Sequence, residues 1–325
     1  MRYRAFGNTG LEVSELVFGG GAVGGLLINQ DDDTKREAIT RALAGGINWI
    51  DTAPSYGQGK SETALGWLLQ EVEAQPYIST KFRIDTTDLF DISGQIERSL
   101  HESLERLQKD KVTLLQLHNP IGAQTTDRMI GLSDVLKPHG VLDALENLRH
   151  QGLFDHFGIT ALGDTPSIIK VLKSNRIASA QVYFNLLNPS AGMVLPPSWP
   201  VYNFTGIIDT CIEHGVAPMN IRVFSAGVIA TQARHGRERP LTPGDTVDSE
   251  TAKATAIFDV IADRFGSRAQ TAIRFALAQP RLACIVFGLA ELEHLTEALA
   301  AEDMGPLSSD DLALIADVYA HFNGG

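Results

Sequence analysis

The sequence predicts an α/β fold, a (β/α)8 TIM barrel with an N-terminal β-hairpin. Three observations predict it. Eight short apolar, β-branched runs recur along the chain, longer segments of helical period separate them, and a stretch of alternating apolar and polar residues precedes the first run. Strands that alternate with helices form parallel sheets, and eight such repeats can close on themselves. No linker-like stretch interrupts the 325 residues, so we expect one barrel domain over residues 1–325.

The elements follow in chain order. Residues 2–16 alternate around the turn Asn8-Thr9-Gly10, which predicts a hairpin that plugs the bottom of the barrel. Ser61 is the predicted N-cap of a helix through Leu65, Leu68 and Leu69. Two further helical patterns are Ile92, Ile96, Leu100, Leu104 and Leu107, and Ile257, Val260, Ile261 and Phe265. The predicted barrel strands are Leu16–Gly19, Ile47–Asp51, Tyr77–Lys81, Val112–His118, His156–Thr160, Ser179–Val182, Val216–Met219 and Ala283–Phe287.

Three connections are longer than a barrel requires: Asn119 to Pro138, Asn188 to Tyr202, and Ser225 to Asp248. Each follows the C-terminal end of a predicted strand, the face at which barrel enzymes build their active sites. Trp199 is the largest apolar side chain on the second connection. Its indole either stacks on a sugar ring or packs against the barrel rim.

Charge and composition limit the classes of partner that the protein is expected to bind. The net charge of −12 would repel nucleic-acid phosphates and anionic membrane surfaces, so we expect a small-molecule substrate. The chain has no signal-peptide pattern and no run of 18 apolar residues, which predicts a cytoplasmic protein. Cys211 and Cys284 are predicted buried free thiols, and no metal-binding pattern occurs. The sequence does not predict the oligomeric state.

Four polar residues converge on the predicted barrel mouth. Asp51, Lys81 and His118 end the second, third and fourth predicted strands, and Tyr56 lies in the loop after the second. Neighbouring strands lie about 4.8 Å apart, so these groups can meet. A free phenol with a pKa of about 10 is a poor acid or base at neutral pH, but an adjacent ammonium stabilises its phenolate. The pattern predicts that Asp51 holds Lys81, that His118 orients the substrate oxygen, and that Tyr56 is the general acid and base.

Several segments carry a family resemblance. "GGINWIDTAPSYGQGKSETALGWLL", "STKF", "LLQLHNP", "FGIT" and "VYFNLLNP" resemble, in order and spacing, the signature segments of the aldo-keto reductase superfamily. The resemblance implies a (β/α)8 barrel, nicotinamide-dependent hydride transfer between a carbonyl and an alcohol, and a catalytic tetrad of Asp51, Tyr56, Lys81 and His118. It also implies that NAD(P) binds without a Rossmann fold. Gly20 and Gly21 of "FGGGAVGG" would then let the backbone approach cofactor and substrate.

The resemblance further implies a set of cofactor contacts. Thr160 replaces a family serine at the nicotinamide carboxamide, although Ala161 lacks the amide that follows it, and Gln181 matches the family glutamine there. Ile221 would face the nicotinamide, and Arg222 would reach the pyrophosphate or form a rim ion pair. The implied cofactor residues are Gly20, Gly21, Thr160, Gln181, Asn220, Ile221, Arg222, Gly288 and Glu291.

The predicted cofactor is NAD rather than NADP. Glu291 and Gly288 are expected near the adenosine ribose, where a carboxylate repels a 2′-phosphate but accepts a hydrogen bond from a 2′-hydroxyl. No Lys or Arg occurs after Arg281, whereas eight acidic residues do. The opposing possibility is NADP, with Arg222 or Arg268 over the phosphate.

"NIRVFSAGVIA" and "QVYFNLLNPSAG" resemble the sugar-dehydrogenase branch of the family. The predicted function is therefore NAD(P)-dependent oxidoreduction at the anomeric carbon of a sugar or at an aldehyde. Two alternatives remain open: a broad NADPH-dependent aldehyde and ketone reductase, and a non-catalytic cofactor-sensing protein.

Overall fold

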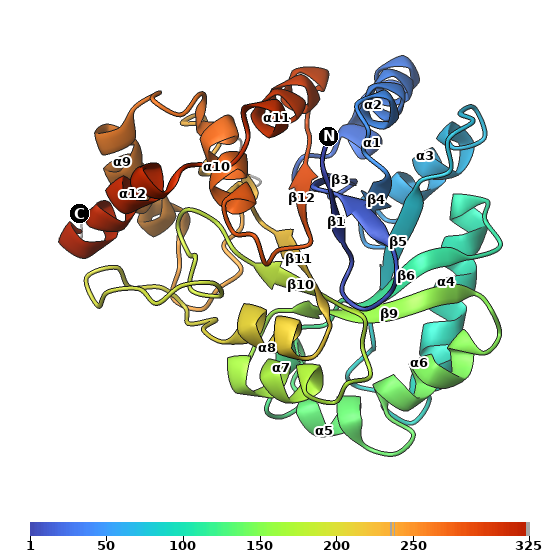
Figure 1. Cartoon of the computed structure of the whole chain (residues 1–325). Helices are drawn as coiled ribbons and strands as arrows, with labels where there is room; N and C mark the ends of the chain where they lie inside the picture. Colours follow the sequence, from blue (N-terminus) through green and yellow to red (C-terminus); the bar gives the residue numbers. More distant parts are fainter. Residues whose placement is uncertain (235, 237, 323–325) are drawn as a thin grey trace.

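The computed structural model describes residues 1–234, 236 and 238–322. Within them, eight parallel strands close a barrel in the order β10-β11-β12-β3-β4-β5-β6-β9 (Figure 1). The predicted (β/α)8 fold is confirmed, and each predicted strand end differs from the observed one by no more than one or two residues. The barrel strands are β3 (Leu16–Gly19), β4 (Trp49–Asp51), β5 (Tyr77–Phe82), β6 (Val112–Leu117), β9 (Phe154–Ala161), β10 (Ser179–Tyr183), β11 (Ala217–Ile221) and β12 (Cys284–Gly288).

Helices surround the barrel (Figure 1). They are α1 (Leu26–Asn29), α2 (Asp32–Ala44), α3 (Lys60–Leu68), α4 (Ile92–Leu107), α5 (Leu132–Leu136), α6 (Val141–Arg149), α7 (Thr165–Leu172), α8 (Ile207–Glu213), α9 (Val247–Ile261), α10 (Arg268–Leu277), α11 (Leu292–Met304) and α12 (Ser309–His321). Spacings of three and four residues place the apolar positions of α4 on one face, and all five predicted ones are buried against the core.

Two details of the helix prediction are wrong. Ser61 is not the N-cap of α3, because Gly59, with φ of 87°, precedes that helix and the Ser61 hydroxyl is hydrogen-bonded to Thr52 Oγ1 at 2.9 Å. Val260 is 51% exposed, so it does not belong to the buried face of α9. That helix ends at Ile261, before the buried Phe265, because Ala262 adopts a positive φ of 48°.

The predicted N-terminal hairpin is present, with β1 (Tyr3–Ala5) antiparallel to β2 (Glu12–Ser14). Its Phe6 and Val13 belong to a buried cluster with side chains near the N-terminal ends of the barrel strands, among them Trp49 and Ala217. The Phe6 and Trp49 rings lie 4.6 Å apart. The hairpin therefore covers the bottom of the barrel and leaves the C-terminal mouth to the long connections.

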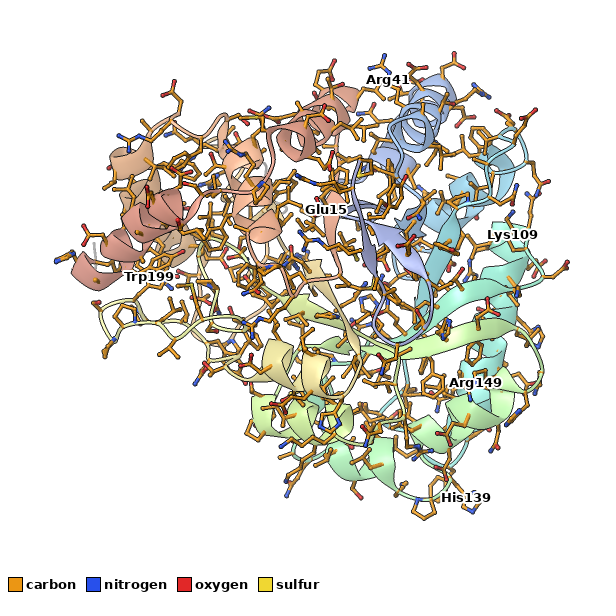
Figure 2. All side chains as sticks on the ribbon, viewed as in Figure 1. Glu15, Arg41, Lys109, His139, Arg149 and Trp199 are labelled. Carbon is orange, nitrogen blue, oxygen red and sulfur yellow. The ribbon has the colours of Figure 1, made fainter. Side chains whose placement is uncertain are left out.

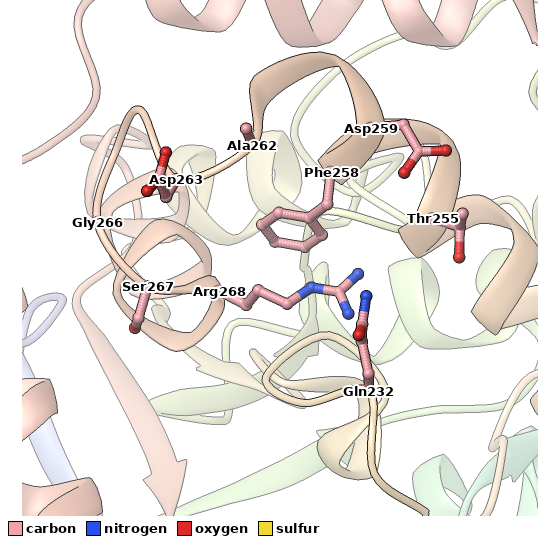
Figure 3. A pocket seen from close by; sticks show the side chains of 9 residues that line it. All are labelled: Gln232, Thr255, Phe258, Asp259, Ala262, Asp263, Gly266, Ser267 and Arg268. Carbon is pink, nitrogen blue, oxygen red and sulfur yellow. The ribbon is translucent and has the colours of Figure 1, made fainter.

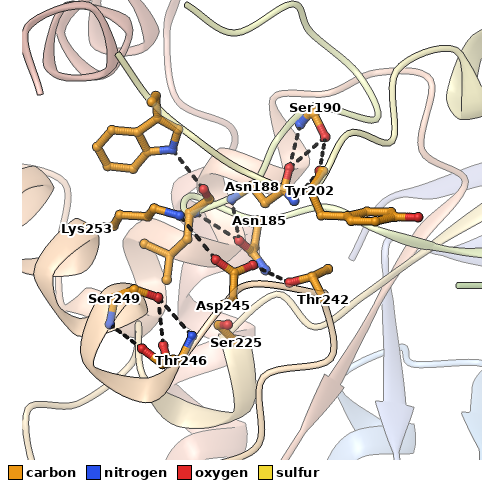
Figure 4. A network of polar contacts seen from close by, with 12 residues as sticks. Asn185, Asn188, Ser190, Tyr202, Ser225, Thr242, Asp245, Thr246, Ser249 and Lys253 are labelled. Carbon is orange, nitrogen blue, oxygen red and sulfur yellow. Dashed lines mark hydrogen bonds and ion pairs between the residues drawn. The ribbon is translucent and has the colours of Figure 1, made fainter. Parts of the chain in front are cut away.

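The three predicted long connections occur as expected. The first contains β7 (Ile121–Gly122) and β8 (Ile130–Gly131), and the third contains the short helix η1 (Ser225–Gly227). Figure 4 shows the polar contacts that hold the second and third connections, such as those of Asn188 with Ser190 and Tyr202 and of Asp245 with Lys253. The second connection is thus held by hydrogen bonds of its own, and the third by a contact to α9.

Trp199 packs into the protein rather than facing a substrate. It is 1% exposed, its Nε1 donates to the Leu187 carbonyl at 2.9 Å, and its ring lies 4.8 Å from Tyr319 and 4.7 Å from Phe322. Figure 2 shows it next to the C-terminal helix α12. Stacking of Trp199 on a sugar ring is therefore the wrong alternative.

Both cysteines are buried free thiols, as predicted. Among the described residues, no helix has the length and apolar character needed to cross a membrane.

Candidate active site at the barrel mouth

The carboxylate of Asp51, the last residue of β4, is the centre of the buried polar cluster. Its Oδ2 accepts a hydrogen bond from Lys81 Nζ at 2.6 Å. Its Oδ1 accepts from Ser79 Oγ at 2.7 Å, Gln181 Nε2 at 3.0 Å and Gln116 Nε2 at 3.4 Å. Asp51 is 2% exposed, so these donors replace water around the charge and fix its orientation.

Lys81 connects this carboxylate to the phenol of Tyr56. Lys81 is 1% exposed, and its Nζ also donates to the Thr52 carbonyl at 2.8 Å and lies 4.8 Å from the centre of the Tyr56 ring. Burial lowers the pKa of Lys81, but Asp51 and Tyr56 outweigh burial and raise it above its usual value. The side chain is therefore a fixed ammonium beside Tyr56.

His118, the residue after β6, also lies close to the phenol. The His118 and Tyr56 ring centres are 5.9 Å apart at 85°, and the His118 backbone N–H donates to the Phe82 carbonyl at 2.8 Å. Burial, Lys81 and Arg83 together lower the pKa of His118 to about 2. The imidazole is thus neutral at pH 7 and can offer one N–H donor. The structure therefore brings the four predicted residues, Asp51, Tyr56, Lys81 and His118, together at the mouth.

The depressed pKa of His118 gives a testable pH dependence of stability. Below pH 6.5 the unfolded chain binds a proton at His118 that the folded protein does not, so this site favours unfolding increasingly as the pH falls. From pH 7 to pH 5 the free energy of unfolding should fall in both proteins. We expect the decrease to be about 1–2 kcal/mol smaller for His118→Asn than for the wild type. Urea denaturation of both proteins at the two pH values measures this, and equal losses would contradict the neutral imidazole.

Thr160 and Gln181 lie side by side on neighbouring strands, where the register of β9 and β10 pairs them. Thr160 is 3% exposed, and its hydroxyl has no hydrogen-bond partner among the described residues. The amide nitrogen of Gln181 donates a hydrogen bond to Asp51. An orphaned hydroxyl next to the Asp51 cluster suits a ligand with amide groups, because a buried polar group without a partner is costly.

The glycines predicted to contact the cofactor differ in their surroundings. A Cβ added at Gly21 or Gly288 would meet no described atom within 4 Å, so the backbone borders open space there. At Gly20 a Cβ would lie 2.5 Å from Ser61 Oγ, so packing against α3 explains that glycine. Gly288 ends β12 and Gly21 lies two residues past the end of β3, and together with the Thr160 hydroxyl they fit a nicotinamide cofactor.

Asn220 and Ile221 end β11, and Arg222 directly follows it. Asn220 is fully buried, and its Nδ2 donates to the Phe184 carbonyl at 2.6 Å, so it braces the strand end. Ile221 is partly exposed. Arg222 has a φ of 63°, and its Nη1 donates to the Arg239 carbonyl at 3.1 Å. Arg222 makes no ion pair with any described residue; burial lowers its pKa, and Tyr183 and Glu250 oppose that shift.

The predicted adenosine end has a carboxylate and, on a different element, a cation. Glu291 is exposed, directly precedes α11 and lies three residues past Gly288, the end of β12. Arg268, at the start of α10, lines a cavity of about 280 Å³ with its guanidinium 4.1 Å from the centre of the Phe258 ring (Figure 3). Its Nε has no hydrogen-bond partner among the described residues, and burial lowers its pKa.

Sequence reasoning missed two donors to Asp51, Ser79 and Gln116. Both could have been found from strand periodicity, because side chains two residues apart on a strand face the same side. Ser79 precedes Lys81 by two residues, and Gln116 precedes His118 by two. The same spacing applied forward from Lys81 reaches Arg83, which was also missed.

Comparisons with known proteins agree with this geometry. The sequence model of the Aldo/keto reductase family matches residues 15–320. D-threo-aldose 1-dehydrogenase of a Pseudomonas species is 26% identical over 315 residues, 89% of this chain and 89% of that protein. L-galactose dehydrogenase of Arabidopsis thaliana is 34% identical over 162 residues, 49% of this chain and 48% of that protein. The holo form of an aldo-keto reductase of Bacillus halodurans has the same fold, with a TM-score of 0.72 at 23% identity over 98% of this chain and 96% of that one.

Proposed function

The chain belongs to the aldo/keto reductase family of oxidoreductases, and on that premise we propose that it transfers hydride between a nicotinamide cofactor and the anomeric carbon of a sugar or an aldehyde carbon. The observation that carries the proposal is the fixed Lys81 ammonium 4.8 Å from the centre of the Tyr56 ring, together with the neutral His118 ring 5.9 Å from the same ring. Relatives that oxidise sugars, the D-threo-aldose and L-galactose dehydrogenases, support the sugar as substrate.

The cofactor supplies the hydride in reduction and accepts it in oxidation. In sugar oxidation, Tyr56 as phenolate takes the proton of the C1 hydroxyl while the C1–H bond breaks and its electron pair leaves as hydride, which yields a lactone and the reduced cofactor. In aldehyde reduction, Tyr56 gives its proton to the carbonyl oxygen as the carbon gains hydride. His118 donates its N–H to the same oxygen, and Lys81 stabilises negative charge on the phenol oxygen.

Asp51 acts through Lys81 in this proposal. Its carboxylate holds the ammonium in place at 2.6 Å, and three neutral donors fix the orientation of the carboxylate. Thr160 and Gln181 would hold the nicotinamide carboxamide. The backbone at Gly21 and Gly288 has no side chain to keep the cofactor away, and Arg222 would face the pyrophosphate. Ile221 would lie against the nicotinamide ring, and Asn220 and Gly20 would support these elements from behind.

Initial rates test this function directly. A panel of aldoses, simple aldehydes and ketones is assayed in both directions with NAD and NADP. We expect the highest kcat/KM for an aldose or an aldehyde. Turnover of ketones and aldehydes alike with NADPH would favour the broad reductase, and cofactor binding without turnover of any compound would favour a cofactor-sensing protein.

We expect a preference for NAD in the same assay, because Glu291 would lie near the adenosine ribose and repel a 2′-phosphate. Glu291→Gln should raise kcat/KM with NADP relative to NAD, whereas Glu293→Gln, a neighbouring exposed carboxylate, should leave the ratio unchanged. A preference of tenfold or more for NADP, about 1.4 kcal/mol, would overturn the prediction. Arg268 would then be the candidate cation, and Arg268→Met should abolish that preference.

A further inference from the structure

Arg83 is placed at the mouth by the same strand that carries Lys81. Ser79 and Lys81 on β5 both direct their side chains to Asp51, so this face of the strand points into the barrel. Arg83 lies two residues further on, one residue past the end of β5, and continues that face. The register of β5 with β6 pairs Lys81 with Gln116, so Arg83 lies level with His118.

The charge of Arg83 reaches both groups that would bracket the reacting oxygen. It contributes to the lowered pKa of His118. Partial burial lowers the pKa of Arg83 itself, and interaction with Tyr56 opposes that shift. The guanidinium remains charged at any physiological pH and keeps access to solvent. Arg83 is therefore a cation on the open side of the candidate active site.

No described residue forms a hydrogen bond or ion pair with the Arg83 side chain. The chain has 39 acidic residues against 27 Lys and Arg, so carboxylates are abundant. Two arginines of the neighbouring helix α4 do pair with carboxylates, Arg106 with Glu62 and Arg98 with Asp91. A guanidinium without a partner beside the reacting groups is a site for an anion from outside the protein.

The cofactor phosphates do not account for this cation. In the barrel order, β5 and β11 are separated by three strands in either direction, so Arg83 and Arg222 lie on opposite sides of the mouth. Arg222 is the residue proposed to face the pyrophosphate. Arg83 is thus left for the substrate.

We propose that Arg83 binds an anionic group of the substrate, so that the enzyme acts on sugars or aldehydes that also carry a carboxylate or a phosphate. This inference rests on the proposed oxidoreductase function and adds the substrate class. The planar guanidinium pairs with either anion through two parallel N–H donors, which a lysine ammonium at the same position cannot do. Binding at Arg83 would orient the reacting carbon toward Tyr56 and His118.

The test compares matched pairs of substrates that differ only in charge. The pairs are glucuronate with glucose, succinic semialdehyde with butanal, and glyceraldehyde 3-phosphate with glyceraldehyde. We expect the wild type to prefer the charged member of at least one pair, and which pair it is separates carboxylate from phosphate. Arg83→Met should lower kcat/KM for that charged substrate about 10- to 100-fold, mainly through KM, and change it less than about threefold for the neutral partner.

Two variants make the result specific. Arg83→Lys keeps the positive charge but lacks the two parallel N–H donors of the guanidinium. It should therefore recover only part of the affinity that Arg83→Met loses. Arg98→Met removes an arginine of α4 that pairs with Asp91, and it should leave every ratio unchanged. Equal effects of Arg83→Met on charged and neutral substrates, or a wild type indifferent to charge, would overturn the inference while leaving the proposed function intact. If the wild type turned over none of these compounds, that result would instead contradict the proposed function.

Discussion

Tyr56→Phe is expected to lower kcat by about 10²–10⁴-fold while leaving cofactor affinity nearly unchanged. The substitution removes only the phenolic hydroxyl, the group that would exchange a proton with the substrate oxygen. His118 cannot take over this role, because burial and nearby cations lower its pKa to about 2, so at neutral pH it is a neutral imidazole with no acidic imidazolium proton to give. Lys81 cannot either, since its raised pKa makes the ammonium a weak acid and Asp51 and the Thr52 carbonyl take two of its three N–H donors.

Steady-state kinetics and cofactor titration by fluorescence measure the two quantities separately. Tyr77→Phe is a matched control, because Tyr77 begins β5 at the bottom of the barrel, next to Trp49 at a ring distance of 5.3 Å. That control should behave as the wild type does. A Tyr56→Phe enzyme with wild-type kcat on the best substrate would remove Tyr56 from the mechanism.

The fold was predictable because its signal is local and repeated. Each barrel strand is a short apolar run between helical segments, and closure needs only that eight such units follow one another. The helix details that failed depend on distant partners or single dihedral angles. Ser61 is drawn away from the cap position by Thr52, and α9 stops at the positive φ of Ala262.

The candidate site was predictable in part for the same reason. Asp51, Lys81 and His118 end neighbouring strands, so strand order alone brings them together. Gln181 was expected only at the cofactor, but its amide nitrogen donates to Asp51 across 130 positions of sequence, and no local pattern contains that contact. Trp199 is likewise buried by Tyr319 and Phe322, which come from the other end of the chain. Contacts of this kind follow from the closed barrel and not from the spacing of residues.

Lys81→Met is expected to lower kcat to a similar extent as Tyr56→Phe, about 10²–10⁴-fold, and to move the pH dependence of sugar oxidation upward. Lys81 neither forms nor breaks a covalent bond in the proposed reaction. Its ammonium stabilises the phenolate of Tyr56. Without that cation, negative charge on the phenol oxygen is less stable, so the optimum of any remaining activity should lie at a higher pH than that of the wild type.

Loss of folding must be separated from loss of the cation. Lys81→Met leaves the buried Asp51 carboxylate with only three neutral donors, and breaking a buried ion pair typically costs about 3–5 kcal/mol of stability. The double variant Asp51→Asn/Lys81→Met removes both charges and should regain much of that stability, as denaturant unfolding would measure. If the double variant is stable yet as inactive as the single one, the missing cation beside Tyr56 explains the lost turnover. A folded variant whose kcat falls without any shift of its pH profile would instead make Lys81 a structural partner of Asp51 alone.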